Sequence, residues 1–264
     1  MIITKTIILL SLSLAISVMV ATIGYAQTPT MVFIKGGIYA PIYGNDSIPV
    51  KVNDFYIDIM PVTNNLYQKF VKDNVKWRKS KVKKIFADGN YMGNWKNDTT
   101  PDVSQNMNSP VTNVSWFAAN EYCRCQGKRL PTVDEWEYVA MANKNLPDAR
   151  KLKTYNEYIL SWYEAPKSYA NTVGSTFKNY WGVYDMHGLV WEWTYDFNSV
   201  LISGESRKDS SNDRNLFCGS GSLGATDLMN YAAFMRYAFR GSLKANYAVR
   251  NLGFRCASDM PIKN

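Results

Sequence analysis

The stretch SWFAANEYCRCQGKRLPTVDEWEY, residues 115–138, contains two helix starts and one helix stop. Ser115 is a favourable N-cap for a first helix, and Gly127 is the residue type that commonly follows the end of a helix. Thr132 and Glu135 have the spacing of a capping box, which predicts a second helix. The stretch therefore predicts two short capped helices joined by a brief link.

The segments on either side are less regular. Residues 31–34 have the pattern of a short buried strand that ends at a glycine pair, and residues 54–59 alternate like a second strand. Thr63 is a suitable N-cap for a helix over residues 64–71. The C-terminal half has glycine, asparagine, serine and aromatic residues in short runs with little helical period. It is therefore predicted to be mostly loop and short strand.

Composition restricts the classes of protein to which the chain can belong. With 264 residues, 46% hydrophobic and 20% charged, it is too apolar for a disordered or collagen-like chain. The net charge of +8 favours acidic partners without identifying one. His187 is the single histidine, so the chain cannot form a metal site with three histidine ligands. A catalytic serine or cysteine activated by a histidine would have to use His187 itself.

The N-terminus has the features of an export signal. Lys5 is followed by an uncharged, mostly apolar run over residues 7–23 and then by Gly24-Tyr25-Ala26. We expect a signal peptide over residues 1–26 and a mature domain over residues 27–264, exported to the periplasm or secreted. The alternative is an uncleaved membrane anchor, because the apolar run is nearly long enough to span a bilayer.

A basic segment follows the first predicted helix. Residues 69–84 contain eight Lys and Arg and one acid, Asp73. Such a run is more often a solvated helix end than a site for phosphate or an anionic surface, so the sequence alone gives it no function.

Several motifs resemble the formylglycine-generating, sulfatase-modifying-factor family. They are PVTNVSW (110–116), EYC (121–123), GKRLPT (127–132), EWEY (135–138), NYWGVYDMHG (179–188), VWEWT (190–194) and NLGFRCA (251–257). The resemblance covers essentially the whole mature chain. It implies a single α+β domain of the formylglycine-generating-enzyme type, with an irregular C-type-lectin-like fold and little regular secondary structure.

The copper ligands that the resemblance implies are missing from this chain. Active members of the family resemble a copper-dependent oxidase in which two cysteines after a Gly-Gly-Ser turn hold Cu(I), and oxygen converts a substrate cysteine to formylglycine. The corresponding turn is GSGS (219–222), and residues 223–240 contain no cysteine. Cu(I) prefers soft thiolates, so copper is not expected and no catalytic residue is identified. Cys218 lies just before the turn, where a buried or bridged role is favoured over a copper ligand.

The other cysteines have structural expectations. The resemblance implies a disulfide between Cys123 and Cys256, which export would permit. Cys125 is two residues from Cys123 on a predicted helix and should point to roughly the opposite face. Cys125 and Cys218 are then either buried thiols or a second pair.

The calcium sites that the resemblance implies are also weakened. Glu192 survives in one loop, but Leu189 replaces the asparagine that the family usually has there. Asn171 matches the start of the other site, whose acidic loop is shortened. Calcium needs six or more oxygen ligands, so Asn171 and Glu192 are candidates in incomplete sites.

The remaining motif residues are expected to support the fold. Trp136, Trp191 and Trp193 have the size and setting of core aromatics. Arg129 and Arg255 can bridge carboxylates or loop carbonyls, with Glu137 or Glu192 as partners. His187 is expected to be a hydrogen-bonded structural residue.

Two classes of function follow. The first is an exported, non-catalytic domain that serves as a binding or assembly scaffold for another exported protein or peptide. The second is a copper-dependent oxidase that converts a sulfatase cysteine to formylglycine with relocated ligands. We expect no nucleic acid partner, and a membrane contact only if the signal is uncleaved. The missing thiolates favour the first class.

Overall fold

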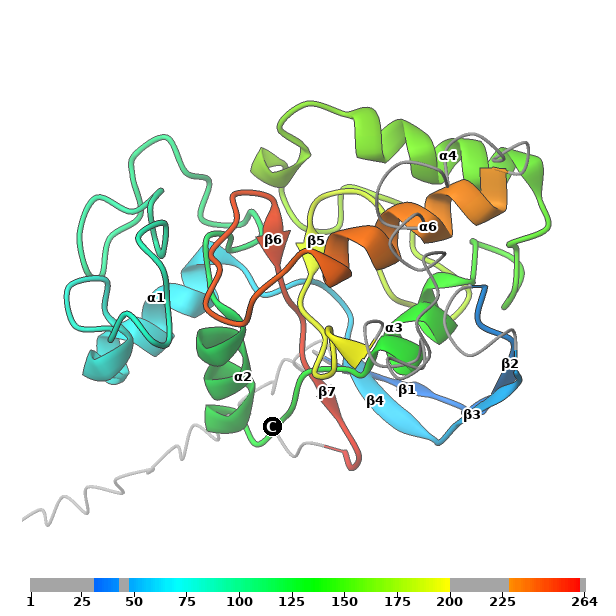
Figure 1. Ribbon diagram of the computed structural model, residues 1–264, viewed down its shortest axis with the longest axis horizontal. Coiled ribbons are helices and arrows are strands. Elements are labelled where there is room, and N and C mark those ends of the chain that lie inside the picture. Colours follow the sequence, from blue (N-terminus) through cyan, green and yellow to red (C-terminus); the bar gives the residue numbers. More distant parts are fainter. Residues whose placement is uncertain (1–30, 43–47, 200–227, 262–264) are drawn as a thin grey trace, which may run out of the picture.

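The computed structural model describes residues 31–42, 48–199 and 228–261, and its regular elements are short and joined by long loops (Figure 1). The expected signal peptide (1–26) and Cys218 lie outside the described residues. No helix in the described ranges is long and apolar enough to cross a membrane. The helices are α1 (Asn64–Asp73), η2 (Val75–Trp77), α2 (Trp116–Cys125), α3 (Val133–Ala140), α4 (Lys153–Glu164), η3 (Ser168–Ala170) and α6 (Leu228–Gly241). The strands are β1 (Met31–Ile34), β2 (Gly37–Tyr39), β3 (Val50–Val52), β4 (Phe55–Asp58), β5 (Trp191–Glu192), β6 (Leu252–Gly253) and β7 (Ala257–Ser258).

Three antiparallel strands connect the beginning of the described chain to its end. Their order is β1-β4-β7, so β4 pairs with both β1 and β7. Phe55 and Ile57 alternate inward on β4 and are almost fully buried. A separate hairpin joins β2 to β3, and β5 pairs in parallel with β6. The predicted strands at residues 31–34 and 54–59 are confirmed.

The three predicted helix starts are present. Thr63 accepts a hydrogen bond from the amide of Leu66 and begins α1, and Ser115 accepts one from Ala118 and begins α2. Thr132 and Glu135 form the complete capping box of α3. Gly127 follows the end of α2 with a φ of 67°, the left-handed conformation that glycine adopts at lowest cost.

Three hydrophobic clusters are found among the described residues, and the two larger ones contain α1, α2 and α3. One packs α1 and α2 against the C-terminal segment, with Tyr67, Trp193 and Phe254 fully buried at its centre. The other packs α3 against the three-stranded sheet. Ala119 and Cys123 of α2 and Trp136 and Val139 of α3 are among the buried residues of these clusters.

The prediction of mostly loop and short strand for the C-terminal half is wrong for two segments. Residues 153–164 form α4 and residues 228–241 form α6, and the two helices pack against each other (Figure 1). Tyr155 and Ile159 on α4 share a buried cluster with Ala232 on α6. Much of the inward surface is aromatic or alanine rather than a run of aliphatic residues, so each helix is stabilised mainly by its partner.

Candidate functional site

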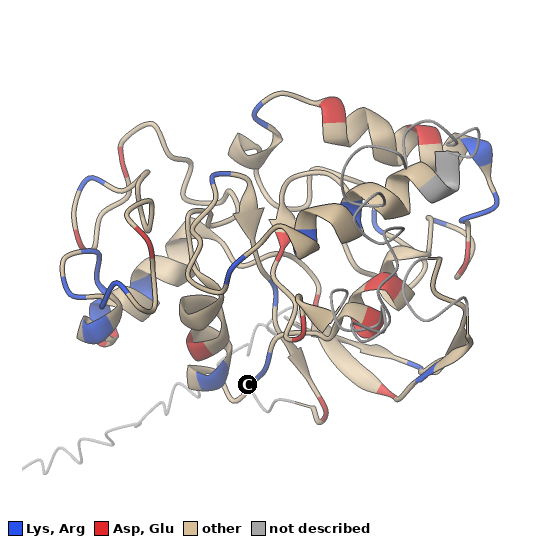
Figure 2. Cartoon of the chain, viewed as in Figure 1, with Lys and Arg blue, Asp and Glu red and all other residues tan. Residues whose placement is uncertain are grey.

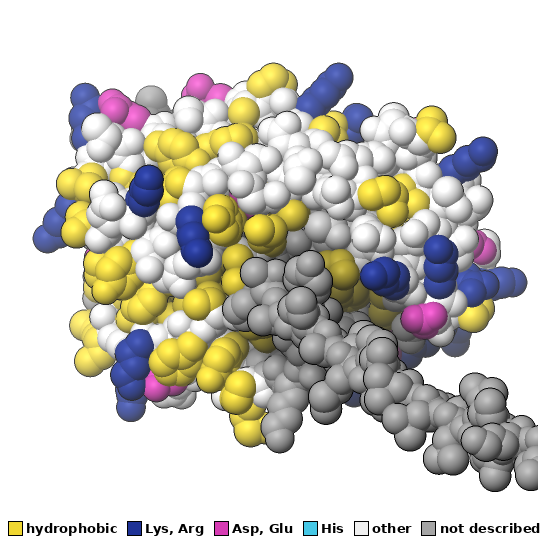
Figure 3. All heavy atoms as spheres, turned by 180° about the vertical axis from the view of Figure 1, so that it is seen from behind, with side chains coloured by type: hydrophobic (Ala, Val, Ile, Leu, Met, Phe, Trp, Pro, Cys, Tyr) yellow, Lys and Arg dark blue, Asp and Glu magenta, His cyan; other side chains and the backbone are white. Residues whose placement is uncertain are grey.

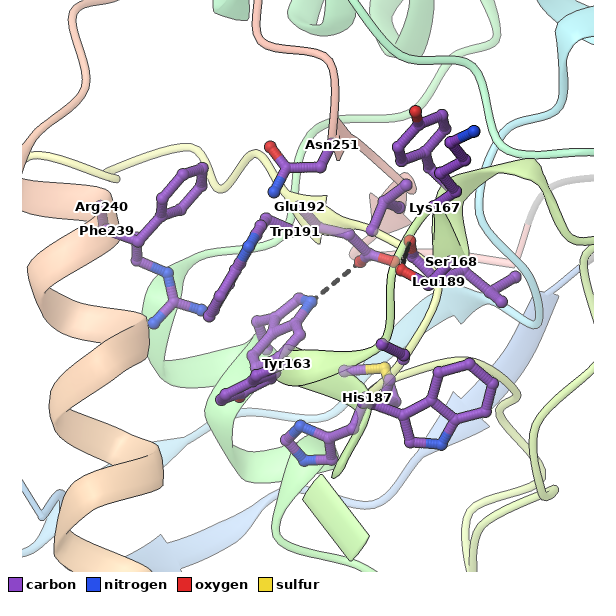
Figure 4. A pocket seen from close by; sticks show the side chains of 17 residues that line it. Tyr163, Lys167, Ser168, His187, Leu189, Trp191, Glu192, Phe239, Arg240 and Asn251 are labelled. Atoms are coloured by element: carbon purple, nitrogen blue, oxygen red, sulfur yellow. Dashed lines mark hydrogen bonds between the residues drawn. The ribbon is translucent and has the colours of Figure 1, made fainter. Parts of the chain in front are cut away.

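A pocket of about 120 Å³ lies between α4, α6 and the loop that enters β5 (Figure 4). The Trp191 ring lies between two others, with centroid distances of 4.6 Å to Tyr163 and 4.8 Å to Phe239. We call this space the aromatic pocket. Its walls come from Trp136, Trp162, Tyr163, Ala165, Lys167, Ser168, Tyr169, Met186, His187, Gly188, Leu189, Val190, Trp191, Glu192, Phe239, Arg240 and Asn251.

A buried cluster of charges adjoins the aromatic pocket. Glu137 of α3 accepts hydrogen bonds from Arg236 Nη2 at 2.8 Å and from Arg240 Nη1 at 2.6 Å, both from α6. Arg236 also donates to the hydroxyl of Tyr163 at 3.2 Å. Burial disfavours the charged carboxylate, but the two guanidinium charges outweigh it and lower the pKa of Glu137 to about 2. The cluster therefore carries one more positive than negative charge.

His187 lies near this cluster, on the wall of a small cavity that Glu137 and Arg236 also line. Its Nε2 lies 2.9 Å from the carbonyl oxygen of Ala140, which can only accept, so Nε2 carries the proton. Its Nδ1 is then an acceptor, and it has no hydrogen-bond partner among the described residues. Burial and the charge of Arg236 lower the pKa of His187 to about 3. The ring is neutral at physiological pH, as a structural histidine would be.

Glu192 is held in a second buried ion pair. Arg255 donates to both of its carboxylate oxygens at 2.8 Å, and Trp136 Nε1 donates to Oε2 at 2.9 Å. Arg255 also donates to the carbonyl of Tyr184 at 2.9 Å. Both members of the pair are inaccessible to solvent, so the pair must retain good geometry to offset the cost of desolvation.

The calcium candidates do not form a fitting ion site. Three N–H bonds already occupy the oxygens of Glu192, and the flanking side chains of Leu189 and Val190 are apolar. Asn171 is an exposed residue directly after η3. Within the ranges that the structure describes, no group of three or more His, Cys, Asp and Glu side chains is placed to hold a metal ion.

Arg129 and Trp193 have structural positions. Arg129 donates two hydrogen bonds of 2.7 Å to the carboxylate of Glu135 and also pairs with Asp259, which ties the start of α3 to the C-terminal segment. Trp193 is fully buried, and its Nε1 donates to the carbonyl of Val114 at 2.9 Å. Sequence reasoning proposed Glu137 and Glu192 as partners of Arg129 and Arg255, and only the pair of Glu192 with Arg255 forms.

The structure contains the disulfide between Cys123 and Cys256, which joins α2 to the chain before β7. Cys125 is the last residue of α2, and its thiol is exposed. The alternative of a buried thiol is therefore wrong for Cys125, because the face opposite Cys123 is turned to solvent. Whether Cys125 pairs with Cys218 concerns a residue outside the described ranges.

The segment that corresponds to the copper-binding region is helical where it is described. Residues 228–240 belong to α6, and this helix buries Ala232, Arg236 and Arg240. A methyl group and two guanidinium groups offer no soft donor, so this face does not fit Cu(I).

A larger open groove of about 890 Å³ lies between the loop at residues 88–105 and residues 247–250. We call it the polar groove. Its lining consists of Asp88, Gly89, Asn90, Gly93, Asn94, Trp95, Asp102, Ser104, Gln105, Asn113, Tyr247, Ala248, Val249 and Arg250. Asn94 Oδ1 and Trp95 Nε1 are buried and have no partner among the described residues.

Comparison with known proteins identifies the family. Residues 19–260 match the sulfatase-modifying factor enzyme 1-like domain. The chain belongs to this family. It is 32% identical to the formylglycine-generating enzyme of Mus musculus over 185 residues, which is 63% of this chain and 49% of that enzyme. The chain therefore spans about half the length of the mouse enzyme.

Two further similarities extend over more of the chain. The inactive C-alpha-formylglycine-generating enzyme 2 of Mus musculus is 28% identical over 282 residues, covering 89% of this chain and 88% of that protein. The solved structure of PvdO from Pseudomonas aeruginosa has a TM-score of 0.50 at 19% identity and covers 88% of this chain and 95% of its own. The fold is thus the irregular α+β fold of the sulfatase-modifying factor family.

Sequence reasoning missed most of the buried charge cluster of this family member. No role was predicted for Arg236 or Arg240 from the sequence, and Glu137 was named as a partner for Arg129 or Arg255 instead. Ala232, Arg236 and Arg240 recur every four residues, which is the spacing of one helix face. That period was the available signal, and it would have predicted α6.

Proposed function

We propose that this chain is an exported, non-catalytic member of the sulfatase-modifying factor enzyme 1-like family, and that it binds another exported protein or peptide in the polar groove. The observation that carries the proposal is that residues 223–240 contain no cysteine and that the inward face of α6, with Ala232, Arg236 and Arg240, offers no soft ligand. Arg236 and Arg240 are committed to Glu137, so they are part of the scaffold rather than of a reactive centre.

The similarity to a protein named as inactive supports this reading. It extends over 88% of the length of the mouse inactive C-alpha-formylglycine-generating enzyme 2, so the resemblance is not confined to one motif. The family fold can therefore be retained without the activity, since fold and function are separable.

The polar groove has the properties of a peptide-binding surface. Its floor is fixed, because Met92 N–H donates to the Asn113 carbonyl at 2.8 Å and Asp88 N–H donates to the Asn246 carbonyl at 2.8 Å. Asn94 Nδ2 donates to Gln105 Oε1 at 3.2 Å, and the partly exposed amide of Gln105 can also pair with the backbone of an extended peptide. A preformed groove also reduces the ordering cost of binding.

The second candidate is a copper-dependent oxidase with relocated thiolates. Cys125 is the exposed thiol that could take part, together with Cys218. Burial and the charge of Glu121 raise the pKa of Cys125, which lowers the fraction of thiolate available for Cu(I). This candidate is therefore less favoured.

An activity assay separates the two candidates. The Cu(I)-loaded protein is incubated under oxygen with a cysteine-containing sulfatase peptide, and the thiol-to-aldehyde mass change is measured beside an active formylglycine-generating enzyme. We expect no aldehyde. Turnover that disappears in Cys218→Ser or Cys125→Ser would replace the non-catalytic proposal with the oxidase.

A binding assay tests the groove. Peptides are selected from a displayed random library on the wild-type protein, and their affinities are measured for two variants. Gly89→Trp fills the groove without strain, because a Cβ at Gly89 meets no atom within 4 Å. Lys144→Trp, at an exposed site outside the polar groove, is the matched control. We expect at least a tenfold loss for Gly89→Trp alone, and equal affinities would reject the groove as the binding site.

A further inference from the structure

One end of the molecule carries exposed lysines around an exposed isoleucine. Lys and Arg segments outnumber the Asp and Glu segments interspersed among them in α1 and the loops beside it, at the left of Figure 2. In the reverse view, basic side chains also outnumber acidic ones at the right-hand edge (Figure 3). We call the segment at residues 78–87 the basic turn. None of its residues lines the aromatic pocket or the polar groove, although Asp88, which lines the groove, directly follows it.

The geometry of the basic turn presents Ile85 to solvent. Phe86 N–H donates to the carbonyl of Lys83 at 2.8 Å, which closes a tight turn around residues 84 and 85. Ile85 is 71% exposed, whereas Phe86 packs against Phe117 with a centroid distance of 5.3 Å. Phe86 thus anchors the turn, and Ile85 lies at its tip beside the exposed side chains of Lys83 and Lys84.

The rest of the basic turn is held to the body of the protein. Arg78 donates to the carbonyls of Val71 at 3.1 Å and Lys72 at 2.9 Å. Lys79 donates to the carbonyl of Trp95 at 3.0 Å. The tip is therefore preorganised, and docking it on a surface would cost little chain entropy.

The positive charge of this end is compensated only in part. Asp98 accepts hydrogen bonds from the amide and the hydroxyl of Ser80, inside the basic turn, at 2.7 and 2.6 Å, and its carboxylate interacts electrostatically with Lys81. Lys76 forms an ion pair with Glu121 at 2.6 Å. Within the part of the chain that the structure describes, no ion pair is formed by Lys69, Lys72, Lys81, Lys83 or Lys84. Lys83 and Lys84 directly precede the exposed Ile85, and Lys69 and Lys72 lie on α1, which precedes the exposed Val75.

We propose that the basic turn docks on the surface of a bilayer that contains anionic phospholipids, with Ile85 inserted at the headgroup boundary and the lysines on the headgroups. A rigid, cationic tip with an apolar residue at its apex gains from both the surface potential and the burial of the isoleucine. A soluble polyanion would use the lysines but would give no gain for Ile85, so the exposed isoleucine favours a bilayer. The residues proposed for this contact do not line the polar groove, so it does not rest on the peptide proposed there.

The test compares variants on vesicles of phosphatidylcholine with and without phosphatidylglycerol. Every variant is isolated from the exported fraction with the same N-terminus, and bound protein is measured by co-sedimentation. The triple change Lys81→Gln, Lys83→Gln and Lys84→Gln should lower the partition coefficient on anionic vesicles on the order of a hundredfold, since each lysine contributes about fivefold. Ile85→Ser should lower it about tenfold.

The matched control removes the same charge elsewhere. Lys144→Gln, Lys151→Gln and Lys153→Gln change exposed lysines distant in sequence from the basic turn, and binding should fall by less than about threefold. Equal loss in both triple variants, equal binding to neutral vesicles, or no effect of Ile85→Ser would overturn the proposal. Binding to heparin with the same lysine dependence but no vesicle binding would assign the basic turn to a polyanion instead.

Discussion

Replacing Glu137 tests whether the buried charge cluster supports the fold. Glu137→Gln keeps the size of the side chain but removes the negative charge that faces Arg236 and Arg240. The cluster would change from one excess positive charge to two in a site where all three side chains are at most 8% exposed. The amide nitrogen of glutamine would also face guanidinium donors instead of accepting from them.

The expected cost follows from the loss of one member of a buried ion pair. Leaving buried charges without a partner typically costs about 3–5 kcal/mol, so the free energy of unfolding should fall by that amount. Urea unfolding followed by tryptophan fluorescence measures it. Glu157→Gln is the control, because Glu157 forms an exposed pair with Lys153 at 3.6 Å and should cost less than about 1 kcal/mol.

The same cluster predicts a dependence on pH. The pKa of Glu137 is lowered from 4.5 to about 2 in the folded state, so its contribution is complete above about pH 4.5 and is lost as the pH falls towards 2. Replacing Glu137, Arg236 and Arg240 together by methionine should cost less than Glu137→Gln, since no charge is left buried. A Glu137→Gln loss of less than about 1 kcal/mol, or a triple variant less stable than the single one, would refute the reasoning.

Four further predictions concern the histidine, the cysteines and the N-terminus. Between about pH 6.5 and 3, His187 is neutral in the folded protein but protonated in the unfolded chain, so it lowers the free energy of unfolding by up to about 1.4 kcal/mol for each unit that the pH falls. His187→Phe removes this contribution, and the free energy of unfolding should therefore decrease less steeply over that pH range. Cys123→Ala with Cys256→Ala opens a loop with a sequence separation of 133 and should lower the unfolding free energy by about 5 kcal/mol, measured in urea. Cys125 should react with a thiol reagent in the native protein, but more slowly than a free thiol at neutral pH, because its pKa is raised. Intact-mass analysis of exported protein should give an N-terminus at Gln27, and a retained apolar run would indicate a membrane anchor instead.

Local hydrogen bonding is what the sequence by itself determined. Ser115 and Thr132 begin their helices through hydrogen bonds with residues three positions later. Both helix starts can therefore be predicted without knowledge of distant contacts. The family motifs added the disulfide between Cys123 and Cys256 and the irregular α+β fold. The pair of Arg255 with Glu192 was among the partners proposed from residue type alone.

Only the tertiary structure decided which distant residues meet. Arg236 and Arg240 reach Glu137 across a sequence separation of about one hundred residues, because α4 and α6 bury each other's faces over α3. No local pattern around Glu137 encodes that partner, since the pairing depends on the packing of three helices. The same is true of Ile85, whose exposure follows from the anchoring of Phe86 on Phe117 and not from its own hydrophobicity.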